Sequence, residues 1–298
     1  MNVSPPSTST WPAPRGGEAA LGSGPAGSLH VSPPSTSTWS APRGGEAVLG
    51  SGPAGSLRAS TPEPGLRGFF ITGTDTEIGK TCITAGLTHL FADAGLRVAP
   101  VKSLAAGQEQ DASGAWVNDD VQRLHAAQRI GMSVEQVGPW QFRAACAPHI
   151  AAALEGRAIE SEAVLAAIRA SARLGELALV EGVGGFRVPL APGWDTADLA
   201  VDLQLPVILV VGLRLGCINH ALLTAEAMAA RGLRLAGWVA NTVDAQMPHV
   251  ADNLAALKAG LSMPFKAPCL GHVPRLSEPT SAAVAAHLVQ PKLLELIR

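Results

Sequence analysis

Short runs of β-branched and apolar residues alternate along most of the chain with longer stretches rich in alanine and leucine. The short runs are typical of buried parallel strands, and the longer stretches have the apolar spacing of helices. The predicted strands are 68–72, 97–102, 177–181, 206–212, 235–240 and 268–273. The predicted helices are 80–94, 119–129, 160–174, 217–231, 247–260 and 281–297. This alternation predicts an α/β domain with a doubly wound, mostly parallel sheet and helices on both faces.

The first 58 residues do not follow this pattern, because residues 3–30 return as residues 31–58 with three differences. The repeated unit is rich in Pro, Gly, Ser and Thr, and so carries too little apolar surface to offset the entropy lost on ordering. It lacks the apolar segment of a secretory signal, and Glu18 and Glu46 argue against a transit peptide. We therefore predict a disordered low-complexity tail over 1–66 and one folded domain over 67–298.

Charge and cysteine content narrow the class of partner. The formal net charge is −2 and no run of five Lys or Arg occurs, which argues against nucleic acid or an anionic membrane. The longest apolar run, 205–213, is too short to cross a bilayer. The four cysteines are far apart and lack metal-binding spacing: Cys82, Cys146, Cys217 and Cys269. These features favour a small-molecule partner and a reducing cytoplasm.

A phosphate-binding loop follows the first predicted strand, in the sequence FITGTDTEIGKT from Phe70 to Thr81. Gly73 and Gly79 let the backbone N–H groups turn inward at the start of a helix, where an anion is stabilised. Lys80 would reach the β- and γ-phosphates, and the Thr81 hydroxyl would ligate Mg²⁺. Five residues separate the two glycines, where the standard motif has four.

Three charged residues at or near predicted strand ends could complete a magnesium and phosphate site. Glu181 ends a strand and Asp120 lies at a predicted helix start, so their carboxylates could serve as hard oxygen ligands. Lys102 ends the second strand and could stabilise charge on a transferring group. Each also has a structural interpretation: Glu181 as a buried carboxylate, Asp120 or Asp119 as a helix N-cap, and Lys102 as a solvated surface charge.

Further polar residues lie at loop-to-helix junctions. The segment 216–220 begins a helix after the most apolar strand, where free N–H groups suit a carboxylate or phosphate, although Asn219 or His220 could instead cap the helix. His149 lies at a similar junction. Asn241 could read a purine edge or hold a loop through a side-chain hydrogen bond.

With these residues assembled, the chain from about Gly68 to its C-terminus resembles the dethiobiotin synthetase family. The loop FITGTDTEIGKT matches that family's phosphate loop, including the five-residue gap and the internal Thr-Glu. Three further blocks match in the same order: LVEGVGG, LPVILVVGLRLGCINHALLT and LAGWVANTV. The resemblance covers nearly all of the predicted domain and none of the repeat.

The resemblance implies a cytoplasmic, homodimeric ligase that uses Mg²⁺ and ATP to carboxylate 7,8-diaminononanoate with CO₂ and close a cyclic urea. It implies catalytic roles for Lys102, Lys80, Thr76 and Glu77, and metal ligation by Thr81, Asp120 and Glu181. The substrate is expected at Ala106 and, across the dimer interface, at Gly216, Cys217, Ile218 and Asn219. ATP is expected at Glu77, Ile78, Gly79, Lys80, Thr81, Cys82, Asp120, Glu181, Gly182, Val183, Gly184, Asn241, Thr242, Pro274, Arg275 and Leu276.

Two positions depart from the family pattern. Ser103 replaces a proline after the catalytic lysine, and Ala106 stands where the family has a substrate-contacting serine. One lost hydrogen bond would cost about 0.5–1.5 kcal/mol unless Ser103 or a water replaces it. Tyrosine is absent from the whole chain, so any role of a tyrosine must be filled otherwise.

Three other functions fit parts of the sequence. A related amide-forming ligase would normally carry a glutaminase domain, for which the chain has no room. A dimeric ATPase switch of the septum-positioning or plasmid-partition kind carries a signature lysine where this chain has Asp75. An inactive binding protein is suggested by Ala106 and the tail, but the set Lys80, Thr81, Lys102, Asp120 and Glu181 argues against it.

Overall fold

A computed structural model of the chain describes residues 65–297. The predicted tail and its repeat lie outside the described residues, apart from 65 and 66.

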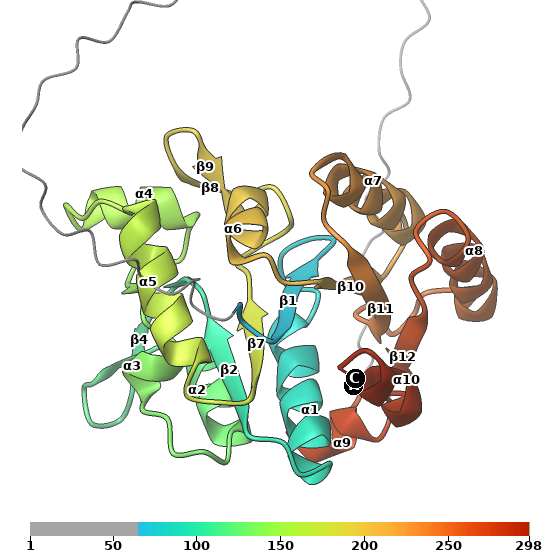
Figure 1. Ribbon diagram of the computed structural model, residues 1–298, viewed down its shortest axis with the longest axis horizontal. Coiled ribbons are helices and arrows are strands. Elements are labelled where there is room, and N and C mark those ends of the chain that lie inside the picture. The colour runs from blue at the N-terminus through green and yellow to red at the C-terminus, as the bar shows by residue number, and fades with distance from the viewer. Residues whose placement is uncertain (1–64, 298) are drawn as a thin grey trace, which may run out of the picture. The chain divides into compact units, whose positions relative to one another are not determined.

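A six-stranded parallel sheet forms the centre of the described region, in the order β12-β11-β10-β1-β7-β2 (Figure 1). All six predicted strands are confirmed, with ends within two residues of the prediction. Their bounds are β1 Gly68–Gly73, β2 Val98–Lys102, β7 Leu177–Glu181, β10 Val207–Leu213, β11 Leu235–Thr242 and β12 Cys269–Val273. Strand β1, which precedes the phosphate-binding loop (P-loop), lies between β10 and β7, so both of its edges are paired.

Five predicted helices are confirmed, and three short ones were not expected. The confirmed helices are α1 Lys80–Asp93, α2 Asp119–Ala127, α5 Ser161–Ala172, α7 Cys217–Ala230 and α8 Val250–Ser262. The additional helices are α3 Val134–Val137, α4 Pro148–Leu154 and α6 Thr196–Leu203. Short strand pairs accompany them: β3 Ala105–Ala106 with β6 Gln141–Phe142, β4 Glu109–Gln110 with β5 Trp116–Val117, and β8 Pro189–Ala191 with β9 Trp194–Asp195.

The single helix predicted over 281–297 is wrong. The structure has α9 Ser281–Ala285 and α10 Gln290–Glu295, and the chain between them joins the edge of the sheet. Leu288 forms a β-bridge with Gly271, and the Val289 amide donates to the Leu270 carbonyl at 2.7 Å. Backbone groups that pair with β12 cannot also pair within a helix, and Pro291 then suits the first turn of a new one.

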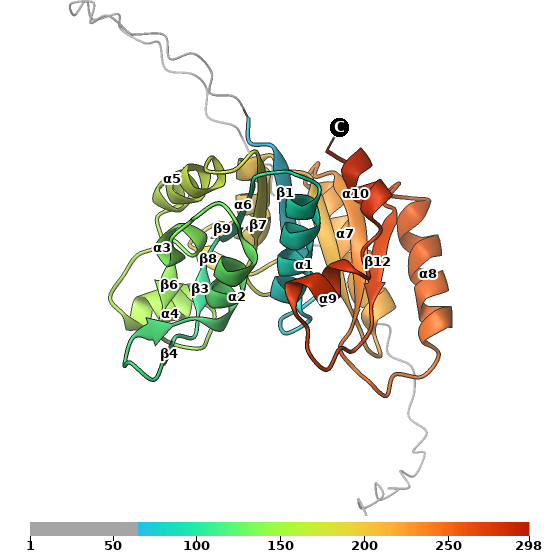
Figure 2. The same ribbon diagram turned by 90° about the horizontal axis from the view of Figure 1, so that it is seen from below.

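Alternation along the strands divides the core between the two faces of the sheet, as expected for period-2 side chains. Phe70, Leu209 and Trp238 belong to one buried cluster, which also takes side chains from α5, α6, α7 and α8. Phe69, Ile208 and Val239 belong to the other, which takes side chains from α1, α9 and α10. Helices therefore cover both faces, as predicted (Figures 1 and 2).

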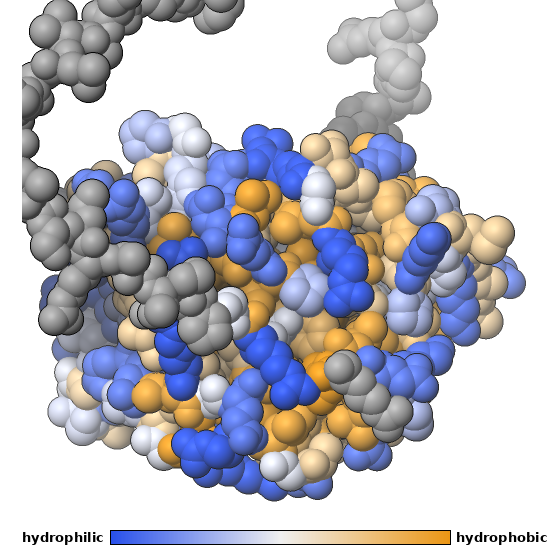
Figure 3. All heavy atoms as spheres, viewed as in Figure 1, coloured by the Kyte–Doolittle hydropathy of each residue, from blue (hydrophilic) through white to orange (hydrophobic). Residues whose placement is uncertain are grey.

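Hydrophilic and hydrophobic residues are interspersed on the face seen in Figure 3. Among the described residues, no helix is both long and apolar enough to span a bilayer.

Shortening a buried side chain of β10 should destabilise the domain. Leu209 has no exposed surface, so Leu209→Ala should lower the free energy of unfolding by about 2–5 kcal/mol through lost burial and a residual cavity. Truncation of Met263, which is 83% exposed at the end of α8, to Ala should cost no more than about 0.5 kcal/mol. Urea denaturation measures both, and equal losses would contradict this assignment of the core.

Candidate active site

The P-loop joins β1 to α1 through two left-handed residues. Glu77 has φ 57° and Gly79, which precedes α1, has φ 83°. The Glu77 side chain is exposed, while the Lys80 ammonium turns back into the loop and donates to the Asp75 carbonyl at 2.9 Å. A left-handed backbone is uncommon for a residue with a side chain, and here it lies where the loop turns toward the start of α1.

Asn241, at the end of β11, anchors this loop. Its Nδ2 donates to the Ile78 carbonyl at 2.8 Å. A Cβ added at Gly79 would lie 2.3 Å from the same Nδ2, so this position requires glycine for space as well as for its positive φ. The sequence left two interpretations of Asn241, recognition of a purine edge and a hydrogen bond that holds a loop. The structure contains the second.

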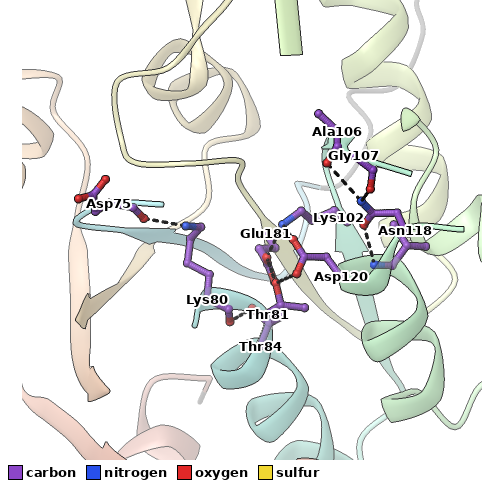
Figure 4. A network of polar contacts seen from close by, with 11 residues as sticks. Asp75, Lys80, Thr81, Thr84, Lys102, Ala106, Gly107, Asn118, Asp120 and Glu181 are labelled. Carbon is purple, nitrogen blue, oxygen red and sulfur yellow. Dashed lines mark hydrogen bonds and ion pairs between the residues drawn. The ribbon is translucent and has the colours of Figure 1, made fainter. Parts of the chain in front are cut away.

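A polar cluster lies beside the P-loop, where β2 and β7 end (Figure 4). Lys102 and Glu181 are register partners on these neighbouring strands. The Lys102 ammonium lies 2.6 Å from Glu181 Oε1 and 2.6 Å from Asp120 Oδ2. The Thr81 hydroxyl lies 2.6 Å from Glu181 Oε1 and 2.7 Å from Asp120 Oδ1. Residues from β2, β7, α1 and α2 thus meet at one point.

Two structural interpretations of these residues are wrong. Lys102 is only 3% exposed, so it is not a solvated surface charge. Neither Asp119 nor Asp120 caps α2, because the N-cap is Asn118, whose side chain accepts from the Val121 amide at 3.2 Å. Asp120 in the first helical turn is therefore free to face the cluster.

The charges in the cluster are matched. Burial opposes the ammonium charge on Lys102, but the carboxylates of Glu181 and Asp120 outweigh it and raise the Lys102 pKa. Burial alone would raise the pKa of Asp120, yet Lys102 and the Thr81 hydroxyl lower it. Burial, together with the charge of Lys102, lowers the pKa of Lys80 from 10.5 to about 8.

The donor set fits a hard cation such as Mg²⁺. A hydroxyl has one proton, so Thr81 cannot donate to both carboxylates at once. Glu181 Oε2 is buried and has no hydrogen-bond partner among the described residues. An oxygen-seeking cation would satisfy these oxygens. No group of three or more His, Cys, Asp or Glu side chains suited to a metal occurs in residues 65–297, and the two carboxylates of this cluster are joined by the one Thr81 hydroxyl.

A cavity of about 990 Å³ opens over the cluster. Many of the predicted site residues line it: Thr76, Glu77, Gly79, Lys80, Thr81, Cys82, Lys102, Ala106, Asp120, Val183, Gly184, Asn241, Thr242, Pro274, Arg275 and Leu276. Seven predicted site residues do not line the cavity. Ile78 and Glu181 are buried, and the other five are Gly182 and, at the start of α7, Gly216, Cys217, Ile218 and Asn219.

Some lining residues were not predicted from the sequence. Arg123, one turn after Asp120 on α2, faces the cavity and donates to the Pro279 carbonyl at 3.2 Å. Cys146 and Pro148 form part of the wall at the start of α4. Spacing along α2 could have indicated Arg123, because residues three apart share a helix face. At the start of α4 the sequence indicated His149, which does not line the cavity and instead pairs with the Pro189 carbonyl at 2.9 Å.

Asp75 holds the tip of the P-loop in a second place. Its carboxylate accepts from the Thr76 amide at 2.8 Å and forms an ion pair with Arg214, in the turn between β10 and α7. The position that carries a signature lysine in ATPase switches is therefore an aspartate engaged within the same chain.

A P-loop after a central parallel strand, with a hydroxyl and two carboxylates beside its lysine, defines a P-loop nucleotide-binding protein. A family model described as an AAA domain matches residues 67–283. The ATP-dependent dethiobiotin synthetase of Janthinobacterium sp. (strain Marseille) is 53% identical over 222 residues, which cover 74% of this chain and 92% of the relative. The chain belongs to the dethiobiotin synthetase family, and the predicted resemblance, fold and enzyme class are confirmed.

Solved structures with similar folds are more distant. The cell division ATPase MinD of Pyrococcus furiosus is 17% identical, covers 77% of this chain and 98% of its own, and has a TM-score of 0.45. A ParA family ATPase of Chlorobium tepidum TLS is 13% identical, covers 77% and 93%, and has a TM-score of 0.43. Likenesses of this size carry no conclusion about function.

Replacing the Asn241 amide should weaken phosphate binding rather than base recognition. Asn241→Asp has the same shape but cannot donate to Ile78, so affinity for ADP and for inorganic pyrophosphate should fall by the same factor, about two- to tenfold. Isothermal titration calorimetry measures both. A loss confined to ADP would show instead that Asn241 reads the base.

Proposed function

We propose that this chain closes the ureido ring of dethiobiotin by the following sequence. One amine of 7,8-diaminononanoate adds to CO₂ to give a carbamate, and a carbamate oxygen takes the γ-phosphoryl group of ATP, releasing ADP. The second amine then attacks the carbonyl carbon and phosphate leaves. The observation that supports it best is the buried Lys102 beside the P-loop, in a chain 53% identical to an ATP-dependent dethiobiotin synthetase.

The P-loop would bind and orient ATP. Its left-handed residues turn backbone N–H groups toward a polyphosphate, and Lys80, already inside the loop, would move from the Asp75 carbonyl to phosphate oxygens. Asn241 and Arg214 hold the loop in shape. Positioning of this kind supplies much of the catalysis in phosphoryl transfer.

Lys102 would stabilise the charge that develops on the transferring phosphoryl group. Its ammonium is fixed by two carboxylates and shielded from water, so it needs little reorganisation during the reaction. Thr76 and Glu77 line the same cavity and would contact the reacting groups. We assign the exposed Glu77 carboxylate to the diamine side, while its backbone N–H serves phosphate.

Mg²⁺ would be held by Thr81, Asp120 and Glu181. When bound, it neutralises charge on the β- and γ-phosphates. Glu181 Oε2 has no hydrogen-bond partner among the described residues and Thr81 has one proton for two carboxylates, so these oxygens retain acceptor capacity for a cation beside the Lys102 ammonium.

A second copy of the chain would complete the substrate site. The segment 216–219 does not line the cavity of its own chain, although the family resemblance gives it the distal carboxylate of the substrate. Large apolar side chains are exposed on α4 and on α7 or just before it, and these helices lie along one edge in Figure 1: Ile150, Leu154, Leu215 and Leu223. A homodimer that covers these residues would bring 216–219 to the partner's cavity.

The two departures from the family pattern have different consequences. Ala106 lines the cavity without a hydroxyl, whereas Ser103 is fully buried and does not line it. The Ser103 hydroxyl has no hydrogen-bond partner among the described residues and cannot replace the missing contact from its place. We expect a water molecule or weaker binding at Ala106.

The cysteines at 82, 146, 217 and 269 are all free, which fits a reducing cytoplasm.

The direct test is phosphate release from MgATP and bicarbonate, with and without 7,8-diaminononanoate, together with mass detection of the cyclic urea. One phosphate per dethiobiotin is expected. Lys102→Gln should abolish both signals while the protein still binds ADP. Hydrolysis indifferent to the diamine, with no urea formed, would reject the synthetase and favour an ATPase switch.

Removing the Thr81 hydroxyl should raise the Mg²⁺ requirement. Thr81→Val keeps the shape but not the ligand, so the half-saturating Mg²⁺ concentration should rise by at least the roughly 10–100-fold that loss of an outer-shell partner costs. Thr81→Ser keeps the hydroxyl and should stay close to the unaltered enzyme. Equal behaviour of the two variants would remove Thr81 from the metal site.

A further inference from the structure

Asn118 lies at the neck of a small hairpin that connects, along the chain, two segments of the site. The hairpin is formed by β4 and β5, with Gly107 just before it and Asn118 just after it. Ala106 precedes the hairpin and α2, which carries Asp120, follows it. The side chain of Asn118 is only 6% exposed.

Every polar atom of this side chain is in use (Figure 4). Its Oδ1 accepts from the Val121 amide at 3.2 Å, which caps α2. Its Nδ2 donates to the Gly107 carbonyl at 2.8 Å and to the Ala106 carbonyl at 3.3 Å. The Asn118 side chain therefore links the segment before the hairpin to the helix α2 that follows it.

The two ends that Asn118 joins have different proposed partners. Ala106 lines the cavity on the diamine side. Asp120, two residues after Asn118, contacts both Lys102 and Thr81 on the metal side. The far edge of the Ala106 segment is already paired, because the Ala105 amide donates to the Trp140 carbonyl at 2.8 Å and the Gly107 amide to the Phe142 carbonyl at 3.1 Å. The near edge, toward α2, is held by Asn118.

We propose that Asn118 is a positioning residue that sets the distance between the diamine wall and the metal-binding carboxylate. This inference rests on the proposed function for the roles of Ala106 and Asp120. The donor arm of the amide fixes the wall at Ala106, where no side-chain hydroxyl is present to orient the substrate. The acceptor arm fixes the first turn of α2 and with it Asp120.

The two arms can be separated by substitution. Asn118→Ser keeps a good N-cap acceptor but is too short to reach the carbonyls of Ala106 and Gly107. Asn118→Ala loses both arms. Ser133→Ala is the matched control, because Ser133 caps α3 through the Gln136 amide and does not line the cavity.

Steady-state kinetics should distinguish the variants. Asn118→Ser should raise the KM for 7,8-diaminononanoate by roughly three- to tenfold, as expected for lost hydrogen bonds, and leave the KM for MgATP and the half-saturating Mg²⁺ concentration unchanged. Asn118→Ala should show the same rise in diamine KM and, in addition, need about fivefold more Mg²⁺. Ser133→Ala should match the unaltered enzyme in all three.

Hydrogen exchange followed by mass spectrometry gives a readout that does not depend on turnover. In Asn118→Ser, exchange should quicken over residues 105–118 while the amides of α2 stay protected; in Asn118→Ala both segments should exchange faster. A folded Asn118→Ser protein with unchanged diamine KM and unchanged exchange would overturn the proposal, as would equal rises in the diamine and MgATP KM. Failure of the unaltered enzyme to form urea would reject the proposed function instead, and the exchange data would still test the bridging role of Asn118.

Discussion

The buried contact between Lys102 and Glu181 constrains the rest of the site. Both side chains are almost completely withdrawn from water, and removing charges from water costs more than most contacts return unless each charge is paired. The Lys102–Glu181 pair forms because β2 and β7 are neighbours in this register. Asp120 of α2 and Thr81 of α1 complete the set of contacts around it. Loss of one partner would leave an uncompensated charge, at a cost of about 3–5 kcal/mol. The stability of the fold therefore depends on the same four side chains to which the proposed function assigns the metal and the phosphoryl group.

Around this cluster, side-chain hydrogen bonds and an ion pair hold the loops of the site in place. Asn241 holds the P-loop at Ile78, and the Asp75–Arg214 pair links its tip to the turn before α7. Asn118 holds the opposite wall. The reacting groups would thus meet in a cavity whose phosphate, metal and diamine sides are each anchored to a different strand or helix, which suits a reaction that depends on positioning.

The sequence predicted those features that are encoded locally. A buried parallel strand reads as a continuous apolar run, so β10 and β7 were found within one residue. Features that depend on distant partners were not found: the break in 281–297 follows from a bridge to Gly271, and the burial of Lys102 follows from Glu181, 79 residues away. Asn118 did leave a signal, because Asn before two Asp residues at a helix start is a strong N-cap, but its second role needs the hairpin.

In the proposed function, Thr81, Asp120 and Glu181 bind the metal of MgATP while Lys102 lies beside it. Anomalous X-ray scattering from crystals of the enzyme grown with Mn²⁺ and a non-hydrolysable ATP analogue locates the metal. This arrangement predicts a manganese peak at bonding distance from the Thr81 hydroxyl and at least one of the two carboxylates, next to the β- and γ-phosphates. A peak elsewhere in the cavity, or Lys102 alone filling the space between Asp120 and Glu181, would contradict it.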